Sequence, residues 1–296
     1  MSTPVKFVLL SAIWGSSFAL IKVAVDAGVP PVWVAFARCL FGAVTLWAMC
    51  GPRRVARRVW LHALVVAALL NSVPFTLLAL GEKLVGSVVA GVVNATTPLT
   101  TLVFALALSV ERLTGRRLAG LAIGLCGVLV LLGVWEGLSG NLLVGGLACL
   151  GATVCYGAGF AYTRRFFMPD GESALVLSAV QIGCAFLQLA VAAPLLGGAP
   201  SWPGVGAMAA LVVLGAVGTG FAYVLNFDVI RGFGPTAAST VTYVTPLWST
   251  ALGVWLLGES VGWNALVGGV IVLVGVLLTR PRHVESTKSG SMVEKT

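Results

Sequence analysis

Long apolar runs, broken by short stretches that carry charged residues, glycine or proline, dominate this chain. A membrane-spanning helix needs about 20 predominantly apolar residues, and the runs have about that length. The pattern therefore predicts an all-α integral membrane protein with ten transmembrane helices and short connections. The predicted ranges are 5–25, 31–50, 60–81, 86–108, 117–134, 142–163, 173–195, 204–227, 235–257 and 262–279.

The composition supports this class of protein. Hydrophobic residues make up 58% of the 296 residues and charged residues 9%, whereas about a quarter of the residues in a soluble domain are charged. A soluble fold of this length cannot bury so much apolar side chain, because most of its surface must face water. This excludes a disulfide-rich secreted scaffold, a disordered chain and a cytosolic enzyme. We expect contact with membrane lipid.

The basic residues predict the orientation, since cytoplasmic loops carry an excess of Lys and Arg. With the N-terminus in the cytoplasm, 15 of the 18 basic residues fall on the inner side. One, Lys83, falls on the outer side, and Lys22 and Arg38 lie within spans. This favours an even number of spans with both termini cytoplasmic. The net charge of +8 is therefore a feature of membrane topology, and no nucleic-acid partner is expected.

The chain also repeats itself at an offset of 148 residues. The segment 86–99 aligns with 234–247, each ending in Thr-Pro-Leu, and Glu111 aligns with Glu259. Near the start of each half the offset is 142, where Trp14-Gly15 aligns with Tyr156-Gly157. The repeat predicts five-helix units at 1–135 and 142–280, followed by a disordered cytoplasmic tail at 281–296.

An odd number of helices per repeat means that the second copy enters the membrane from the opposite side. Inverted repeats are the architecture of many secondary transporters, in which substrate binds near the midplane between the halves and rocking alternates access. The order of three motifs also resembles the EamA-type branch of the drug/metabolite transporter superfamily. These motifs are the segment 14–18 (Trp-Gly-Ser-Ser-Phe), the duplicated Thr-Pro-Leu helix and the segment 257–259 (Leu-Gly-Glu). The resemblance implies a ten-helix inner-membrane exporter or permease for small metabolites, amino acids among them.

Two prolines are candidate hinges. Pro98 and Pro246 are predicted in mid-span, where proline leaves the carbonyl four residues earlier without its helical partner. Those carbonyls belong to Asn94 and Thr242, which are repeat equivalents. Each half thus offers a substrate contact and a bend. The alternative is a simple kink in which Thr97 or Thr245 satisfies the carbonyl.

Other polar and aromatic residues within the spans are candidates for a substrate pocket suited to a ligand with an apolar body and a few hydrogen-bonding groups. Alternatively, the polar residues connect helices and the aromatic residues pack. The full set of candidate binding residues is Trp14, Arg38, Asn71, Phe75, Asn94, Thr97, Tyr156, Tyr223, Thr242, Thr245 and Trp248.

Arg38 is the charged residue that lies deepest within a predicted span, about seven residues into the second one. Ionisable residues inside membranes are functional candidates, so Arg38 is expected to bind a substrate carboxylate or to pair with Asp26 or Glu82. No acidic residue is predicted at the centre of a span, which disfavours proton coupling through a central acid. Uniport or exchange of neutral or zwitterionic metabolites fits better.

A secondary transporter working by alternating access is the leading prediction, with a passive channel or facilitator and a proton-coupled drug exporter as alternatives. We expect no enzymatic activity, no catalytic residues, no cofactor and no metal site, because the two histidines, His62 and His283, form no motif. Glycine pairs such as Gly120 and Gly124 favour packing within the molecule over dimerisation. We therefore expect a monomer or a weak homodimer.

Overall fold

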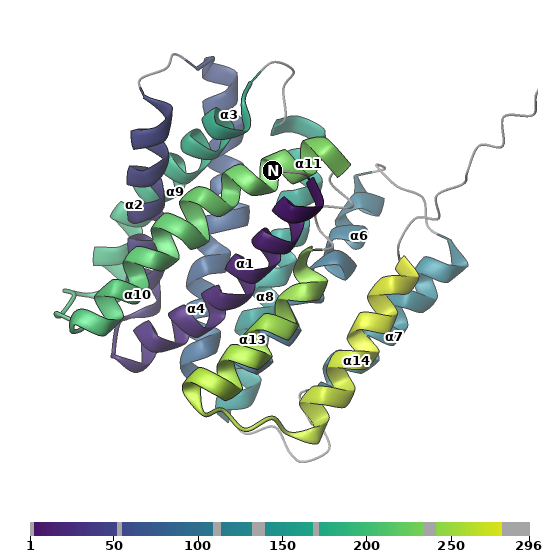
Figure 1. Cartoon of the computed structure of the whole chain (residues 1–296). Helices are drawn as coiled ribbons and strands as arrows, with labels where there is room; N and C mark the ends of the chain where they lie inside the picture. Colours follow the sequence, from purple (N-terminus) through teal and green to yellow (C-terminus); the bar gives the residue numbers. More distant parts are fainter. Residues whose placement is uncertain are drawn as a thin grey trace, which may run out of the picture.

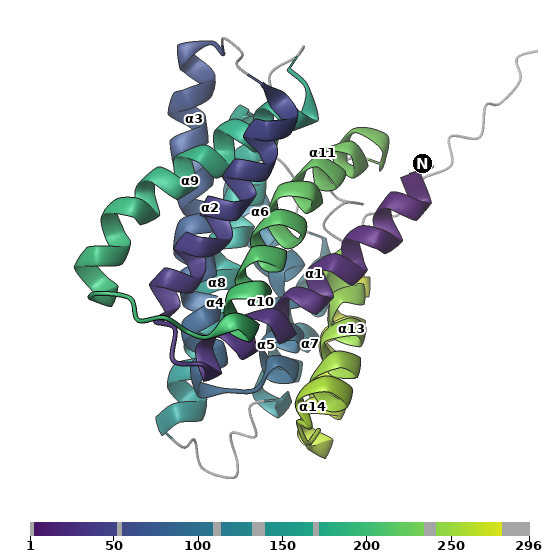
Figure 2. The same ribbon diagram turned by 60° about the vertical axis from the view of Figure 1, so that its left-hand side comes forward.

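A computed structural model describes residues 3–51, 55–108, 114–131, 140–167, 172–233 and 241–279. These residues form helices and no strand, arranged as a bundle (Figures 1 and 2). The predicted tail at 281–296, Glu111 and the segment 234–240 lie outside the described residues. The α-helices are α1 (Thr3–Asp26), α2 (Pro31–Cys50), α3 (Arg57–Ala67), α4 (Val73–Leu84), α5 (Ser87–Asn94), α6 (Thr97–Ala107), α7 (Gly115–Leu131), α8 (Gly140–Tyr162), α9 (Ala174–Gly197), α10 (Val205–Gly215), α11 (Ala222–Phe233), α13 (Val241–Leu257) and α14 (Trp263–Thr279).

Seven helical stretches of the described residues are long and apolar enough to cross a membrane. Two shorter apolar helices, Val244–Leu257 and Trp263–Gly275, lie near the C-terminal end. The all-helical class and several membrane spans are thus confirmed. Each of the ten predicted ranges overlaps a described helix, but the number of spans and their inverted arrangement stay predictions.

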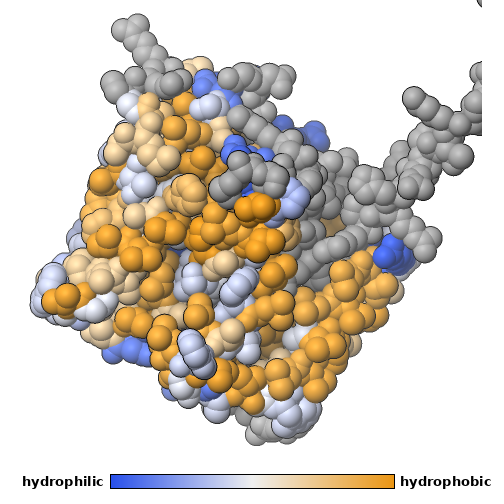
Figure 3. All heavy atoms as spheres, viewed as in Figure 1, coloured by the Kyte–Doolittle hydropathy of each residue, from blue (hydrophilic) through white to orange (hydrophobic). Residues whose placement is uncertain are grey.

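The exterior of the bundle is apolar. Large hydrophobic side chains such as Val205, Leu195 and Trp255 are more than three-quarters exposed, and hydrophobic residues make up most of the coloured surface in Figure 3. Exposed apolar surface on this scale is unfavourable in water and favourable against lipid. The outer surface is therefore the one expected of a protein that lies in a bilayer.

The described residues include three wider, π-helical turns: η3 (Thr163–Phe167) follows α8, and the other two each join a pair of helices. Of these two, η1 (Ala68–Ser72) joins α3 to α4, and η4 (Ala216–Phe221) joins α10 to α11. They begin 148 residues apart, at the offset of the sequence repeat. Such turns often mark functional sites, and here η1 and η4 each directly precede a helix that carries an aromatic candidate residue.

The predicted span 86–108 is interrupted in the structure. Helix α5 ends at Asn94, and α6 begins at Thr97 after a two-residue turn. Pro98 therefore lies in the first turn of α6, where a missing amide hydrogen costs least, and the prediction of a mid-helix proline is wrong there. Pro246, in contrast, lies inside the continuous helix α13.

The predicted span 60–81 is also longer in the structure, because the helical stretch continues through α4 to Leu84. This places Glu82 inside the helix, and its side chain is completely buried. The sequence pattern had assigned this residue to a connection, since a charged Glu82-Lys83 pair ends the apolar run. Burial of the carboxyl is thus a feature that the pattern of apolar residues did not predict.

Helices α7 and α14 form a tight pair at one edge of the bundle (Figures 1 and 2). A Cβ atom on Gly275 would come within 2.4 Å of the Gly124 nitrogen and 2.7 Å of the Gly120 carbonyl oxygen. A Cβ atom on Gly127 would lie 2.6 Å from the Val272 nitrogen. The glycines let the two backbones touch, so the Gly120/Gly124 pair packs within the molecule, as predicted.

Candidate functional site

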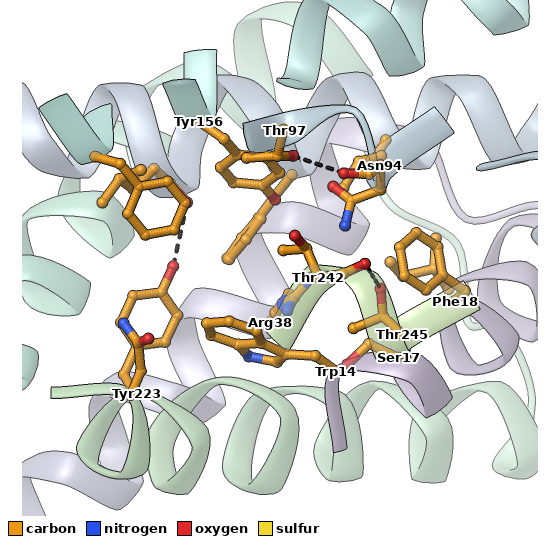
Figure 4. A pocket seen from close by; sticks show the side chains of 16 residues that line it. Trp14, Ser17, Phe18, Arg38, Asn94, Thr97, Tyr156, Tyr223, Thr242 and Thr245 are labelled. Atoms are coloured by element: carbon orange, nitrogen blue, oxygen red, sulfur yellow. Dashed lines mark hydrogen bonds between the residues drawn. The ribbon is translucent and has the colours of Figure 1, made fainter. Parts of the chain in front are cut away.

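A cavity between helices of both halves of the chain is the candidate functional site (Figure 4). About 650 Å³ of space here is not filled by protein atoms, and part of this space is open to the outside of the molecule. Side chains from α1, α2, η1, α4, α5, α6, α8, α11 and α13 line it. They are Trp14, Ser17, Phe18, Ile21, Arg38, Leu70, Phe75, Leu78, Asn94, Thr97, Tyr156, Phe160, Tyr223, Asn226, Thr242 and Thr245.

Nine of the eleven candidate binding residues line this cavity. The exceptions are Asn71 and Trp248. Asn71 is fully buried behind the wall and donates from Nδ2 to the Tyr223 hydroxyl at 2.6 Å. Trp248 is 38% exposed and donates from Nε1 to Ser11 Oγ at 3.3 Å. Both side chains therefore have structural contacts, and neither borders the cavity.

The cavity wall is assembled from repeat-equivalent residues. At the offset of 148, Phe75 pairs with Tyr223, Leu78 with Asn226, Asn94 with Thr242, and Thr97 with Thr245. At the offset of 142, Trp14 pairs with Tyr156 and Phe18 with Phe160. Twelve of the sixteen lining residues thus belong to six pairs. Corresponding positions of the two halves face one common space.

Arg38 is the charged side chain among the described residues of the wall. It is 5% exposed, and its Nε donates to Thr219 Oγ1 at 2.8 Å. Its Nη2 lies 3.4 Å from the Gly218 carbonyl oxygen. The guanidinium carbon is 3.7 Å from the centre of the Phe75 ring, a cation–π arrangement. η4 thus holds one edge of the guanidinium group and Phe75 holds one face.

The expected ion pair of Arg38 with Asp26 or Glu82 does not occur among the described residues. Asp26 accepts instead from Lys22, at 2.7 Å in the same helix. A guanidinium group carries five N–H donors, and the contacts above use two of them. In a desolvated site a cation with neutral partners favours an anionic group of a ligand. The geometry therefore leaves Arg38 suited to bind a carboxylate.

The carbonyls freed by the two prolines are satisfied locally. Thr97 Oγ1 donates to the Asn94 carbonyl oxygen at 2.7 Å, and Thr245 Oγ1 donates to the Thr242 carbonyl oxygen at 2.9 Å (Figure 4). The simple-kink alternative thus accounts for the carbonyls themselves. The side-chain amide of Asn94, in contrast, is not satisfied: its Oδ1 is buried and has no hydrogen-bond partner among the described residues.

Asn226 Oδ1 is a second buried acceptor with no partner in the described part of the chain. Both amides line the cavity, and an unsatisfied buried acceptor costs about 1–3 kcal/mol. The site therefore combines one cation, two acceptors that lack donors, and walls of aromatic and aliphatic side chains.

Seven lining residues were not among the candidates: Ser17, Phe18, Ile21, Leu70, Leu78, Phe160 and Asn226. Most follow a candidate by one or two helical turns. Ser17 and Ile21 follow Trp14 by three and seven positions, and Asn226 follows Tyr223 by three. Residues at these spacings share a helix face, so extending each candidate along its helix would have identified them.

Comparison with known proteins decides the family. The profile of the EamA-like transporter family matches residues 3–133 and 143–280. The chain belongs to this family. It is 31% identical over 292 residues to the uncharacterized inner membrane transporter YedA of Escherichia coli (strain K12), covering 94% of this chain and 91% of that protein. It is 26% identical over 306 residues to the uncharacterized transporter YcxC of Bacillus subtilis (strain 168), covering 97% and 96%.

The overall fold also occurs in a solved structure. A crystal structure of another protein superimposes with a TM-score of 0.64 at 23% identity, covering 94% of this chain and 96% of that one. This likeness extends over nearly the whole EamA chain. The EamA-like family and the apolar helices together identify a membrane protein of a transporter family, which confirms the resemblance seen in the sequence.

Proposed function

We propose that this EamA-family chain is a secondary transporter, an exporter or permease that moves small neutral or zwitterionic metabolites such as amino acids by alternating access. Its ten spans form two inverted five-helix repeats, at 1–135 and 142–280. The observation that carries the proposal is the cavity wall, which is built from six pairs of repeat-equivalent residues. A site shared by two related halves is where rocking of one half against the other alternates access.

The chemistry of the wall supports a zwitterionic substrate. Arg38 supplies a cation for a carboxylate, and Asn94 Oδ1 and Asn226 Oδ1 supply acceptors for an ammonium group. An ammonium group has three donors and no acceptor, so it complements unpartnered amide oxygens. Aromatic side chains such as Trp14 and Tyr156 offer an apolar surface for the rest of the molecule. A large apolar α-amino acid fits this set of groups.

The proposal also includes the membrane location, the orientation and the assembly of the protein. We propose an inner-membrane location, in keeping with the name of the E. coli relative, and cytoplasmic termini from the distribution of Lys and Arg. The disordered tail at 281–296 and the monomer or weak homodimer stay predictions. Placing Gly86 and Gly234 on opposite faces of the membrane by cysteine accessibility would test the inverted arrangement.

Counterflow in proteoliposomes tests the transport mechanism. Liposomes loaded with unlabelled L-phenylalanine should accumulate external radiolabelled L-phenylalanine transiently, because a carrier exchanges substrate across the membrane. A passive channel equilibrates the label without this overshoot. If the wild type conducts an amino acid of a test panel but no member of the panel gives trans-stimulation, alternating access is contradicted.

A further inference from the structure

Glu82 is a buried acid that the proposed transport site does not use. It lies in α4 with a completely buried side chain, and neither carboxyl oxygen has a hydrogen-bond partner among the described residues. A carboxylate buried without a donor is strongly unfavourable in a protein interior. Accepting a proton at one oxygen forms an O–H bond, removes the negative charge and removes this cost.

The groups packed around Glu82 do not supply a neutralising contact. From α1 come Lys22 and Asp26, which bond to each other at 2.7 Å. From α2 comes Arg38, whose Nε and Nη2 face η4. α8 contributes the buried Cys149 thiol. The described residues of η1 and α5, which also pack on α4, include no titratable side chain.

The remaining neighbour is Glu259, which follows α13. Its Oε1 accepts from the Ser87 amide at 2.8 Å and its Oε2 from the Val88 amide at 3.1 Å. Two backbone donors at a helix N-terminus stabilise the charged form of a carboxylate. Both carboxyl oxygens of Glu259 thus have hydrogen-bond donors, whereas neither oxygen of Glu82 has one among the described residues.

A surface hollow lies at this end of the molecule. Glu259 is partly exposed and lines this hollow together with Gly86 and Val88. The hollow gives solvent access to the partly exposed Glu259 side chain. Towards the N-terminal end of α4, one helical turn before Glu82, Leu78 lines the proposed substrate cavity. Glu82 therefore lies in the part of α4 between this surface hollow and the cavity lined by Leu78.

We propose that Glu82 is a proton-binding site, and that its protonation is linked to binding of a substrate carboxylate at Arg38. The linkage part rests on the proposed function. A charged Glu82 competes with the substrate carboxylate for the positive field of Arg38, whereas a protonated Glu82 does not. Since linkage is reciprocal, substrate binding favours uptake of a proton from water by Glu82. Proton and substrate then occupy the protein together.

Infrared spectroscopy on the full chain in liposomes, without substrate, tests the proton site. The wild type is expected to show the carbonyl-stretch band of a buried protonated carboxyl at neutral pH. Glu82→Gln should lack this band, and Glu82→Asp, which keeps the acid, should shift it. The control Asp228→Asn, at a partly exposed acid that pairs with Lys6 and is not among the groups around Glu82, should leave it unchanged. Absence of the band in the wild type, or its full retention in Glu82→Gln, would overturn the site.

The linkage is tested with L-phenylalanine in a weakly buffered suspension containing a pH indicator. At a pH where the infrared band shows that Glu82 of the substrate-free protein is partly ionised, binding to the wild type and to Asp228→Asn should take up protons. The apparent affinity should weaken as the pH rises further, by at most about tenfold per pH unit. In Glu82→Gln binding should persist with neither effect. Binding to the wild type without proton uptake overturns the linkage. If phenylalanine does not bind at all, both the linkage and the substrate class are wrong, and the infrared band still decides the proton site.

Discussion

Arg38 of α2 and Thr219 of η4 are joined by a buried hydrogen bond of 2.8 Å, across 181 residues of sequence. A second buried hydrogen bond has the same arrangement with the two halves of the chain exchanged. Gln181 of α9 donates from Nε2 to Asn71 Oδ1 in η1 at 2.7 Å. Asn71 and Thr219 are repeat equivalents at the offset of 148. In each case a long polar side chain of one half is fixed by the π-helical turn of the other.

This equivalence separates two roles that one scaffold performs. Gln181 is neutral and fully buried, and its partner Asn71 continues the chain of hydrogen bonds to Tyr223. Arg38 is charged and borders the cavity. The Gln181–Asn71 contact therefore stabilises the packing of the two halves, and the Arg38–Thr219 contact positions a cation at the cavity.

Replacing Arg38 tests the cation directly. Arg38→Gln should raise the apparent substrate constant for L-phenylalanine about tenfold to a hundredfold, since hydrogen bonds to charged groups contribute about 1.5–3 kcal/mol and each 1.4 kcal/mol is tenfold. Arg38→Lys should be intermediate, because it keeps the charge without the planar donor array. Uptake kinetics in proteoliposomes measure this. A loss of folded yield with an unchanged substrate constant would identify Arg38 as a structural ion.

Tyr223→Phe tests the stabilising chain of hydrogen bonds from Gln181 through Asn71 to Tyr223. The Tyr223 hydroxyl accepts from Asn71 and donates to the Leu70 carbonyl oxygen at 3.2 Å, so its removal leaves buried polar groups unpaired. We expect the free energy of unfolding to fall by about 1–3 kcal/mol, measured as a lower melting temperature in detergent. Tyr162→Phe is the matched control, because its hydroxyl bonds His62 at a partly buried site and its loss should cost less. Equal melting temperatures for wild type and Tyr223→Phe would exclude this stabilising role.

The sequence predicted most of the helices because the bilayer imposes their length and apolar character. It placed nine of the candidate residues around one cavity because the repeat singles out positions that face the same space in both halves. It could not predict that Leu70 borders the cavity and its neighbour Asn71 does not, since a π-helical turn at 68–72 alters the residue spacing from that of an α-helix. Nor could it predict burial of Glu82, because charge at the end of an apolar run ordinarily marks a connection.

The two prolines are predicted to differ in effect. Pro98 follows the break between α5 and α6, whereas Pro246 interrupts the hydrogen bonding of the continuous helix α13. Pro246→Ala restores an amide donor in mid-helix, so it should stiffen α13 and slow counterflow severalfold with little change in expression. Pro98→Ala should slow counterflow as well, but less, because the turn at Ala95 and Thr96 remains. Wild-type counterflow rates in both variants would rule out the hinge role.

Glu259 connects the two halves at the N-terminus of α5. Its carboxylate accepts from the Ser87 and Val88 amides, two groups that a helix leaves unsatisfied at its start. Glu259→Ala should lower the free energy of unfolding by about 0.5–2 kcal/mol, and Glu259→Gln by less, because the amide retains one acceptor. Thermal melting in detergent measures both. A destabilisation by Glu259→Gln as large as that by Glu259→Ala would mean that charge matters more than the hydrogen bonds.

The contact between α7 and α14 leaves no room for a side chain at Gly275. An added methyl group would lie 2.4 Å from the Gly124 nitrogen, and because that atom is backbone, the two helices must separate. Gly275→Ala should therefore destabilise the protein by about 1–3 kcal/mol, although alanine is the better helix former by about 1 kcal/mol. Gly115→Ala, in α7 but facing open space, should be neutral or slightly stabilising. Melting temperatures of the two variants compare them, and equal values would show that α7 and α14 can move apart without cost.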